Sequence, residues 1–320
     1  MEERPIPTPG PGDVLVRVSS VGVCGSDTHY YRHGRIGNFV VEAPLVLGHE
    51  AAGTIVGVGE GVDGSRIGER VSIEPQRPDP DSEETRRGHY NLCPHMRFYG
   101  TPPIDGAFCD YVTIGSGYAH RVPDSVSDDA AALCEPLSVG IAAVRKAGLD
   151  GGSRVLITGA GPIGIVLTQL ARAYGATDIV VSDPDGDRRA QAQHFGATQV
   201  LDPSAAPVGE LGVDAFIDAS GAPSAVVDGI RAVRPAGTVV LVGSGAESLE
   251  LPTQLIQNRE LVLTGVFRYA NTWPTAIALV ESGRVDLDAM VTAHFPLEKA
   301  AEALDSDRTP GSVKSVVTVS

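Results

Sequence analysis

Three kinds of side chain that bind zinc stand at separate points of the sequence. They are Cys24, the neighbouring pair His49 and Glu50, and Glu135. Thiolate, imidazole and carboxylate groups are good zinc ligands, and a catalytic zinc needs three of them with one position left open. Taken singly, Cys24 is more often a buried thiol and His49 a core histidine, so spacing alone leaves the metal site open.

A glycine-rich motif of the G-x-G-x-x-G type gives the second chemical signal. An apolar stretch, Val155–Ile157, precedes the motif, and a run with helical period begins within it. Glycines in this setting let the backbone turn tightly and approach a pyrophosphate at the positive end of a helix. The motif predicts a dinucleotide site, and the alternative is a structural turn. The motif residues expected at the cofactor are Gly159, Gly161, Pro162, Ile163 and Gly164.

Cofactor choice depends on the residues after the next predicted strand. Asp183 ends that strand, where a carboxylate accepts hydrogen bonds from the ribose hydroxyls and disfavours a 2′-phosphate. Asp183 therefore favours NAD over NADP. Arg188 and Arg189 lie nearby and would tolerate a phosphate, so NADP stays open, and Arg188 is expected at the cofactor.

The spacing of apolar residues follows two different patterns along the chain, and these patterns predict the elements that would position the groups named above. Up to about residue 125, short apolar runs between glycines and prolines read as strands. A helical run follows at Ala130–Ala147, and strands then alternate with helices, which predicts a parallel sheet covered on both faces. The strands expected early are Val14–Val18, Gly53–Val58 and Ala107–Thr113, with a β-rich tail at Ser312–Val319 that could return to the first domain.

The composition bounds the class of protein. A formal net charge of −15 over 320 residues would repel nucleic acid and anionic membranes. No apolar stretch approaches the roughly 18 residues of a membrane span, and the first residues lack the features of a signal peptide. Four scattered cysteines do not form a disulfide framework. We expect a cytoplasmic protein that acts on a small molecule, without nucleic-acid or membrane partners.

A longer pattern surrounds His49 and carries a resemblance. Gly48-His49-Glu50-x-x-Gly53, with Gly59 and Val62 at the expected intervals, resembles the zinc signature of the medium-chain dehydrogenase/reductase family. Further segments resemble its polyol branch, to which sorbitol and xylitol dehydrogenases belong. These segments are Gly34–Phe39, Gly88–Pro94, Glu135–Gly140 and Gly265–Pro274. The resemblance implies a zinc- and NAD-dependent oxidation of a secondary hydroxyl of a polyol to a ketose.

The resemblance also implies one catalytic zinc, held by Cys24, His49 and a glutamate, with water completing its coordination. In this branch Glu50 and Glu135 share the carboxylate role, one directly and the other through water, and the sequence does not choose between them. Asp27 matches the position that orients the zinc histidine, with a local turn as the alternative.

A second, structural zinc would need four closely spaced cysteines. Between residues 71 and 112 the sequence has only Cys93 and Cys109, so we expect no structural zinc.

Roles in the reaction follow from the same resemblance. Ser26 and His29 stand at positions that relay the hydroxyl proton, or are turn residues, and Glu135 is expected beside the reacting hydroxyl. The predicted substrate residues are Tyr30, Phe98, Thr101, Arg268 and Tyr269, with Arg268 also on the cofactor side.

The fold class expected is α/β, with two domains. A discontinuous catalytic zinc domain, mostly β, irregular and GroES-like, would comprise residues 1–137 and 269–320. A doubly wound, Rossmann-type domain would comprise residues 138–268. Family members assemble as dimers or tetramers, and the strands Val239–Val242 and Leu261–Val266 are the candidates for that interface.

Two alternatives to a polyol dehydrogenase remain. One is another zinc-dependent dehydrogenase of this family, acting on threonine, butanediol or a simple alcohol. The other is a non-catalytic nucleotide-binding protein on the same fold. Relatives begin further upstream with a strand pair, and we expect that an upstream extension would raise the thermal stability of the catalytic domain.

Overall fold

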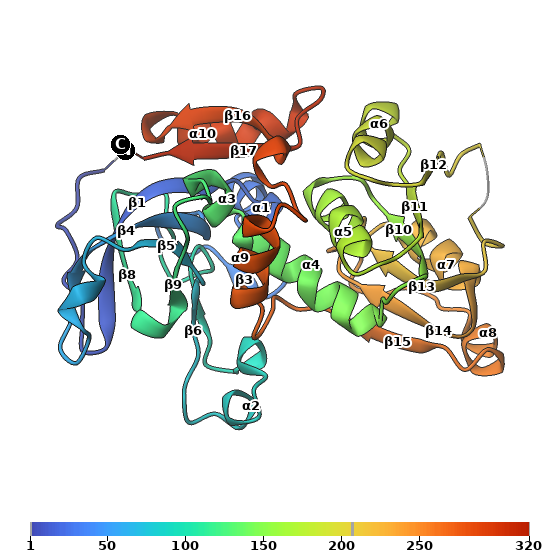
Figure 1. Cartoon of the computed structure of the whole chain (residues 1–320), viewed down its shortest axis with the longest axis horizontal. Helices are drawn as coiled ribbons and strands as arrows, with labels where there is room; N and C mark the ends of the chain where they lie inside the picture. Colours follow the sequence, from blue (N-terminus) through green and yellow to red (C-terminus); the bar gives the residue numbers. More distant parts are fainter. Residues whose placement is uncertain (1, 206–207, 320) are drawn as a thin grey trace. The chain divides into compact units, whose positions relative to one another are not determined.

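The computed structural model describes residues 2–205 and 208–319, and the chain divides into two compact units (Figure 1). Unit 1 comprises Met1–Glu135 and Trp273–Ser320, and unit 2 comprises Pro136–Thr272. None of the helices in the described ranges has the length and apolar character that crossing a lipid bilayer requires.

Unit 1 is built mainly from strands. Its strands are β1 Asp13–Gly22, β2 Arg35–Ile36, β3 Phe39–Val40, β4 Glu50–Val58, β5 Arg70–Ile73, β6 Gln76–Arg77, β7 Arg97–Phe98, β8 Tyr111–Gly115, β9 Ala119–Arg121, β16 Val291–Pro296 and β17 Lys314–Thr318. Its helices are α1 Gly25–His33, α2 Glu83–Arg86, α3 Asp128–Ala132, α9 Trp273–Glu281 and α10 Ala300–Asp305.

The main sheet of unit 1 has the order β16-β17-β1-β4-β5-β9, and β8 also pairs with β1. β1 buries alternate residues such as Val14, Val16 and Val18, as expected for a strand with one face on a core. The C-terminal strand β17 pairs antiparallel with β1, with Gly22 opposite Val316. The expected return of the tail to the first domain is therefore confirmed, and the sheet joins residues from both ends of the chain.

The strand predicted at Ala107–Thr113 is wrong in its first half, since β8 begins only at Tyr111. The N–H groups of Gly106, Ala107 and Phe108 donate to the carbonyl oxygens of residues 46–48, at 2.7 to 2.9 Å. These bonds use the backbone groups that a strand would offer to the sheet. They also tie this segment to the loop that leads into His49.

Unit 2 is an alternation of strands and helices. Its strands are β10 Arg154–Thr158, β11 Asp178–Ser182, β12 Gln199–Leu201, β13 Val213–Asp218, β14 Val233–Leu241 and β15 Val262–Gly265. Its helices are α5 Pro162–Ala173, α6 Gly186–His194, α7 Pro223–Ala232 and α8 Thr253–Asn258, and α4 Cys134–Ala147 leads into it from unit 1.

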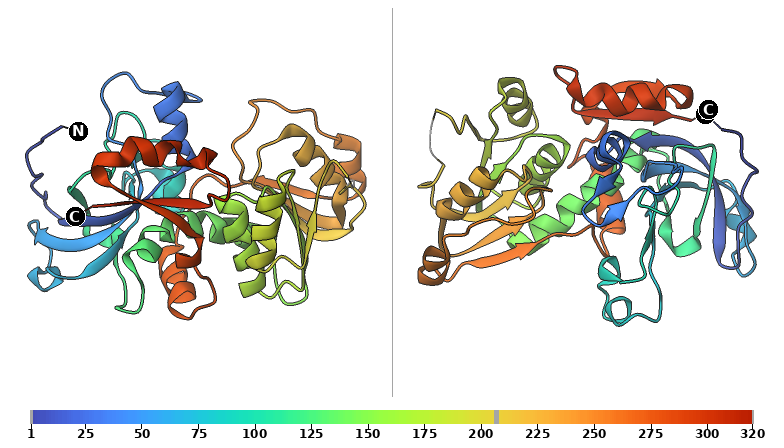
Figure 2. Two further views of the ribbon diagram at one scale, coloured as in Figure 1. Left: turned by 90° about the horizontal axis from the view of Figure 1, so that it is seen from above. Right: turned by 180° about the vertical axis from the view of Figure 1, so that it is seen from behind.

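The sheet of unit 2 has the order β12-β11-β10-β13-β14-β15, and all its neighbouring pairs are parallel. The order reverses between β10 and β13. Because crossovers between parallel strands are right-handed, α5 and α7 cover opposite faces of the sheet (Figure 2). This is the Rossmann arrangement, and a dinucleotide binds where the order reverses. The predicted α/β fold class is confirmed.

The helical run predicted at Ala130–Ala147 is two helices, α3 and α4, separated at Leu133. α3 also begins earlier than predicted, because the Ser127 hydroxyl accepts a hydrogen bond from the Ala130 N–H at 2.9 Å.

Gly229 offers a test of the packing in unit 2. A Cβ at this position of α7 would lie 2.1 Å from the ring of Phe216, which is fully buried in β13. We expect Gly229→Ala to destabilise the protein by about 1–3 kcal/mol, since overpacking forces the ring or the helix to move. The measurement is the midpoint of urea unfolding.

The same substitution at Gly186 is the control. This helical glycine of α6 has only the end of a flexible arginine near the added carbon, at 3.7 Å. Gly186→Ala should be neutral or stabilise the protein by up to about 1 kcal/mol. Equal effects of the two substitutions would contradict the packing described here.

Candidate zinc and dinucleotide sites

Pairing between β1 and β4 brings the predicted metal ligands together. Cys24 caps α1 just after β1, and Glu50 begins β4, where it lies opposite Gly22 of β1. The ligand atoms of Cys24, His49 and Glu50 all lie within 4.8 Å of one another, and His49 and Glu50 are buried. Among the described residues this is the group of side chains with the spacing of a metal site. One thiol, one imidazole and one carboxylate at this spacing fit a zinc ion.

Asp27 links the segment of Cys24 to the segment of His49 through hydrogen bonds from their backbones. This fully buried carboxylate accepts hydrogen bonds from the N–H of Gly48 at 2.9 Å and the N–H of Cys24 at 3.1 Å. Its Oδ1 lies 3.4 Å from Nδ1 of His49, which leaves Nε2 of that ring for a metal. Burial alone would raise the pKa of Asp27, but His49 and the two N–H donors hold it below the usual range.

Sequence reasoning missed Lys314, whose charge faces the ligand cluster. Lys314 lies on β17, and its ammonium is 2.6 Å from Glu50 although both side chains are almost fully buried. The ammonium also donates to the carbonyl oxygen of Val23 at 2.8 Å. Burial alone would lower the pKa of Lys314, but Glu50, Cys24 and Glu135 raise it. The available signal was a lysine at an inward-facing position of an apolar strand.

Glu135 stands outside the three-ligand group. It lies in the first turn of α4 and is buried, and its charge acts on Lys314. Of the two glutamates, the structure therefore groups Glu50 with Cys24 and His49, with Glu135 nearby in the same unit.

The other predicted residues of unit 1 lie on two segments, one with Phe98 and Thr101 and the other α1, with Ser26, His29 and Tyr30. Phe98 is buried with its ring 5.5 Å from that of His49, and the N–H of Thr101 donates to the Phe98 carbonyl. Ser26 is half-buried in the first turn of α1. His29, by contrast, is exposed on α1, and its ring packs against His33 at 4.6 Å. Tyr30 is buried on the same helix.

The glycine motif of unit 2 forms the turn between β10 and α5. Gly159 has a φ of +88°, in the left-handed region that favours glycine. A Cβ at Gly164 would lie 1.9 Å from the Gly159 carbonyl oxygen, so only glycine fits, whereas Gly161 faces open space. Pro162 begins α5, and Ile163 follows it half-buried. This turn, residues 159–164, which we call the dinucleotide cradle, fits a pyrophosphate at the N-terminus of α5.

Asp183 closes the other side of this cradle. Its carboxylate accepts hydrogen bonds from the N–H of Ala160 and the N–H of Asp185, both at 2.8 Å. Arg188 lies exposed on α6. Arg268 and Tyr269 belong to unit 2 near its C-terminal end, where Arg268 lies over the Phe267 ring at 4.8 Å and Tyr269 is buried.

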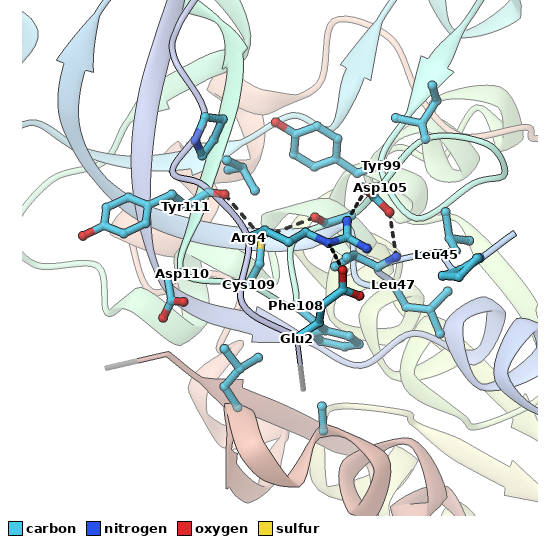
Figure 3. Close-up of a pocket in the computed structure, with 18 of the residues that line it drawn as sticks. Glu2, Arg4, Leu45, Leu47, Tyr99, Asp105, Phe108, Cys109, Asp110 and Tyr111 are labelled. Carbon is cyan, nitrogen blue, oxygen red and sulfur yellow. Dashed lines mark hydrogen bonds and ion pairs between the residues drawn. The ribbon is translucent and has the colours of Figure 1, made fainter.

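A cavity of about 1310 Å³ lies elsewhere in unit 1 (Figure 3). Its lining, within the described residues, includes none of the predicted site residues. Arg4 spans it to Asp105 at 2.8 Å, and Asp105 accepts a hydrogen bond from the Val46 N–H. This cavity has no part in the two sites.

Two family models match separate stretches of the chain. Residues 10–124 match the alcohol dehydrogenase GroES-like domain, and residues 162–282 match the zinc-binding dehydrogenase domain. The chain is 44% identical to sorbitol dehydrogenase of Gallus gallus over 324 residues, which covers 98% of this chain and 91% of that protein.

The chain belongs to the zinc-dependent polyol branch of the medium-chain dehydrogenase/reductase family.

Two solved structures of this family show the same fold. A zinc-binding dehydrogenase from Sinorhizobium meliloti 1021, bound to NADP, is 32% identical with a TM-score of 0.91, covering 98% of this chain and 94% of its own. An alcohol dehydrogenase from Escherichia coli CFT073, complexed with NADH, is 30% identical with a TM-score of 0.93 and the same coverage. One of these two relatives thus binds NADP and the other NADH.

Membership in this dehydrogenase family confirms the predicted class of protein. The chain is an oxidoreductase that acts on CH–OH groups, with zinc and a nicotinamide dinucleotide as its cofactors. A family of catalysts leaves no support for the alternative of a non-catalytic nucleotide-binding protein.

The buried pair of Lys314 and Glu50 predicts a large loss of stability when one partner is removed. We expect Lys314→Met to destabilise the zinc-free protein by about 3–5 kcal/mol, because the substitution leaves Glu50 buried without its cation. Lys314→Arg should restore part of the loss. Urea unfolding after chelation of zinc is the measurement.

Lys299→Met is the matched control. Lys299 pairs with Glu302 at 3.4 Å on the surface, with more than half of each side chain exposed. Its loss should change the free energy of unfolding by no more than about 0.5 kcal/mol. A similarly small effect at Lys314 would show that the buried pair does not stabilise unit 1.

Proposed function

We propose that the protein oxidises a secondary hydroxyl of a small polyol, of the sorbitol or xylitol type, to a ketose and passes hydride to NAD. The observation that carries the proposal is the cluster of Cys24, His49 and Glu50, with ligand atoms within 4.8 Å, in a chain that also has a complete dinucleotide turn. The identity of 44% to a sorbitol dehydrogenase supports the polyol as substrate class.

In this proposal Cys24, His49 and Glu50 would hold the zinc directly, and Glu135 would act nearby without binding it. When bound, zinc supplies a Lewis acid that stabilises the deprotonated form of the substrate hydroxyl. Lys314 compensates the negative charge that Glu50 brings into the buried cluster, at 2.6 Å. Asp27 fixes the His49 ring so that Nε2 is available as the ligand atom.

Glu135 is the proposed proton acceptor near the substrate hydroxyl. A buried carboxylate close to the cluster has the chemistry for this task. Ser26 lies on the first turn of α1, directly after Cys24, and would pass the proton on. His29 would release it to solvent, for which its exposed position is suited.

Five residues are the proposed substrate contacts. Tyr30, Phe98 and Thr101 are the residues of unit 1, and Phe98 already lies against His49. Arg268 and Tyr269 are the residues of unit 2, with Arg268 also at the cofactor. Hydroxyl and guanidinium groups suit a polyhydroxylated substrate, because such a pocket rejects analogues that lack a hydroxyl.

The dinucleotide contacts are proposed from the cradle geometry. Gly159, Gly161, Pro162, Ile163 and Gly164 would bind the pyrophosphate with their backbone and the helix terminus. Asp183 would accept hydrogen bonds from the adenosine ribose, and Arg188 would lie beside it.

A homo-oligomer through unit 2 belongs to the same proposal. β15 is at the edge of the sheet, where Val262 and Leu263 expose 56% and 36% of their surfaces, and Phe267, two residues past the strand, exposes 50%. An exposed apolar edge strand favours pairing with a second copy. Of the two strands predicted for this interface, Val239–Val242 is unsuited, because Val239 and Val240 are buried in the core of unit 2.

The free state of all four cysteines supports a cytoplasmic location.

The substrate class can be tested by measuring NAD reduction at several alcohols. We expect turnover of sorbitol, xylitol or ribitol, and loss of that turnover when zinc is chelated. Mannitol, threonine, butanediol and ethanol complete the panel. NAD reduction with threonine, butanediol or ethanol but with no polyol would assign the enzyme a substrate of another class. No NAD reduction with any of these alcohols would contradict the proposed reaction.

Zinc content separates the roles of the two glutamates. We expect Cys24→Ser and Glu50→Gln to lose zinc, whereas Glu135→Gln should keep it and lower kcat by about 100-fold or more. Metal content after dialysis and kcat are the measurements.

Cys109→Ser is the control for zinc loss by the thiol variant. Cys109 is also a thiol of unit 1, but burial raises its pKa to about 11 and it lies outside the cluster. The Cys109→Ser variant should therefore keep its zinc. Zinc loss in Glu135→Gln with retention in Glu50→Gln would reverse the assignment of the glutamates.

A further inference from the structure

Two opposite charges meet at the ribose end of the dinucleotide cradle. The carboxylate of Asp183 is held on both oxygens by backbone N–H groups, so it cannot turn away from a ligand. Arg189, from α6, reaches the same strand end, where its Nη1 donates to the Asp183 carbonyl oxygen at 2.7 Å. A carboxylate there favours NAD, whereas a nearby arginine accommodates the 2′-phosphate of NADP. The two side chains therefore favour different cofactors.

Asp202 forms an ion pair with Arg189. It directly follows β12, and its Oδ2 lies 3.3 Å from Nη2 of Arg189. Its Oδ1 accepts hydrogen bonds from the hydroxyl of Ser204 at 2.6 Å and from the N–H of Ser204 at 2.9 Å. These bonds hold the pKa of Asp202 below its usual range, so the side chain is an anion. One oxygen is thus anchored to the loop and the other engages Arg189.

The position of Arg189 follows from these contacts. Its guanidinium is held between the Asp183 carbonyl and Asp202, and only about a fifth of the side chain is exposed. The Asp183 backbone is itself adjacent to β12, because the Asp183 N–H donates to the Leu201 carbonyl at 3.2 Å. Asp202, Arg189 and Asp183 therefore form one connected set across β11, β12 and α6.

We propose that Asp202 is a cofactor-specificity residue that acts through Arg189. By engaging the guanidinium, Asp202 keeps it from pairing with a 2′-phosphate. This inference rests on the dinucleotide site of the proposed function. It assigns Asp202 and Arg189 a positioning role in the choice of cofactor, beyond the contact that Asp183 makes with the ribose.

The test is the affinity of the purified chain for NAD⁺ and NADP⁺ by isothermal titration calorimetry. Asp202→Asn should strengthen NADP⁺ binding by about 10-fold, the size of one charge-assisted hydrogen bond, and change NAD⁺ binding by less than about 2-fold. In the Arg189→Leu background the same Asp202→Asn change should have no such effect. A purely structural role of Asp202 would weaken both dinucleotides together.

Asp228→Asn is the matched control, because it removes one negative charge from unit 2 by breaking an exposed pair with Arg231 at 3.0 Å. It should leave the ratio of the two affinities unchanged. The inference is overturned if Asp202→Asn leaves that ratio unchanged, if Asp228→Asn changes it equally, or if the gain persists without Arg189.

The wild-type titration keeps this inference apart from the proposed function. Binding of NAD⁺ with an unchanged ratio in Asp202→Asn would overturn only the role of Asp202. Failure of the wild type to bind either dinucleotide would overturn the proposed cofactor site and this inference together.

Discussion

A carboxylate with 1% of its surface exposed has to be compensated, and the fold of unit 1 meets this constraint with the two ends of the chain. Glu50 begins β4, and its cation comes from Lys314 of β17, 264 residues later. An unpaired buried charge costs several kcal/mol, so β17 has to pair with β1 in the register that delivers the ammonium. The discontinuity of unit 1 is thus a consequence of electrostatics as much as of packing.

The same pair adjusts the charge of the ligand cluster. Glu50 pairs directly with Lys314 at 2.6 Å, and the charge of Glu135 acts on the same ammonium. A buried network of paired charges of this kind stiffens the side chains of the cluster.

The sequence predicted those features that depend on neighbours in the chain. The turn at Gly159–Gly164 was predicted because the strand, the glycines and the helix follow one another directly, and the alternation of unit 2 has the period of its elements. The start of the strand predicted at Ala107–Thr113 is wrong, since the bonding partners of Ala107 and Phe108 lie about sixty residues away at Gly48 and Leu47. Hydrophobic pattern cannot reveal a partner at that separation.

The same limit applies to the charged residues of the sites. Cys24, His49 and Glu50 were singled out by their chemistry and a family pattern, but the pairing of Glu50 with Lys314 has no local signature. Asp202 likewise reads as an ordinary turn residue beside Ser204. Only the arrangement of β11, β12 and α6 shows that it faces Arg189. The sequence shows which residue types are present, whereas the electrostatic potential at a site depends on how the fold places the charged residues.

Both sites are built with one device, a carboxylate that accepts backbone N–H groups from two segments. Asp27 joins the segments of Cys24 and Gly48, and Asp183 joins the glycine turn at Ala160 to the loop at Asp185. Hydrogen bonds to a charged group contribute about 1.5–3 kcal/mol each, roughly twice a neutral bond. Each aspartate therefore fixes the backbone around a site, and Asp27 also lies 3.4 Å from Nδ1 of His49. The cations near these two sites are paired with other carboxylates, since Lys314 contacts Glu50 and Arg189 contacts Asp202, so each site contains a cation that already has an anionic partner.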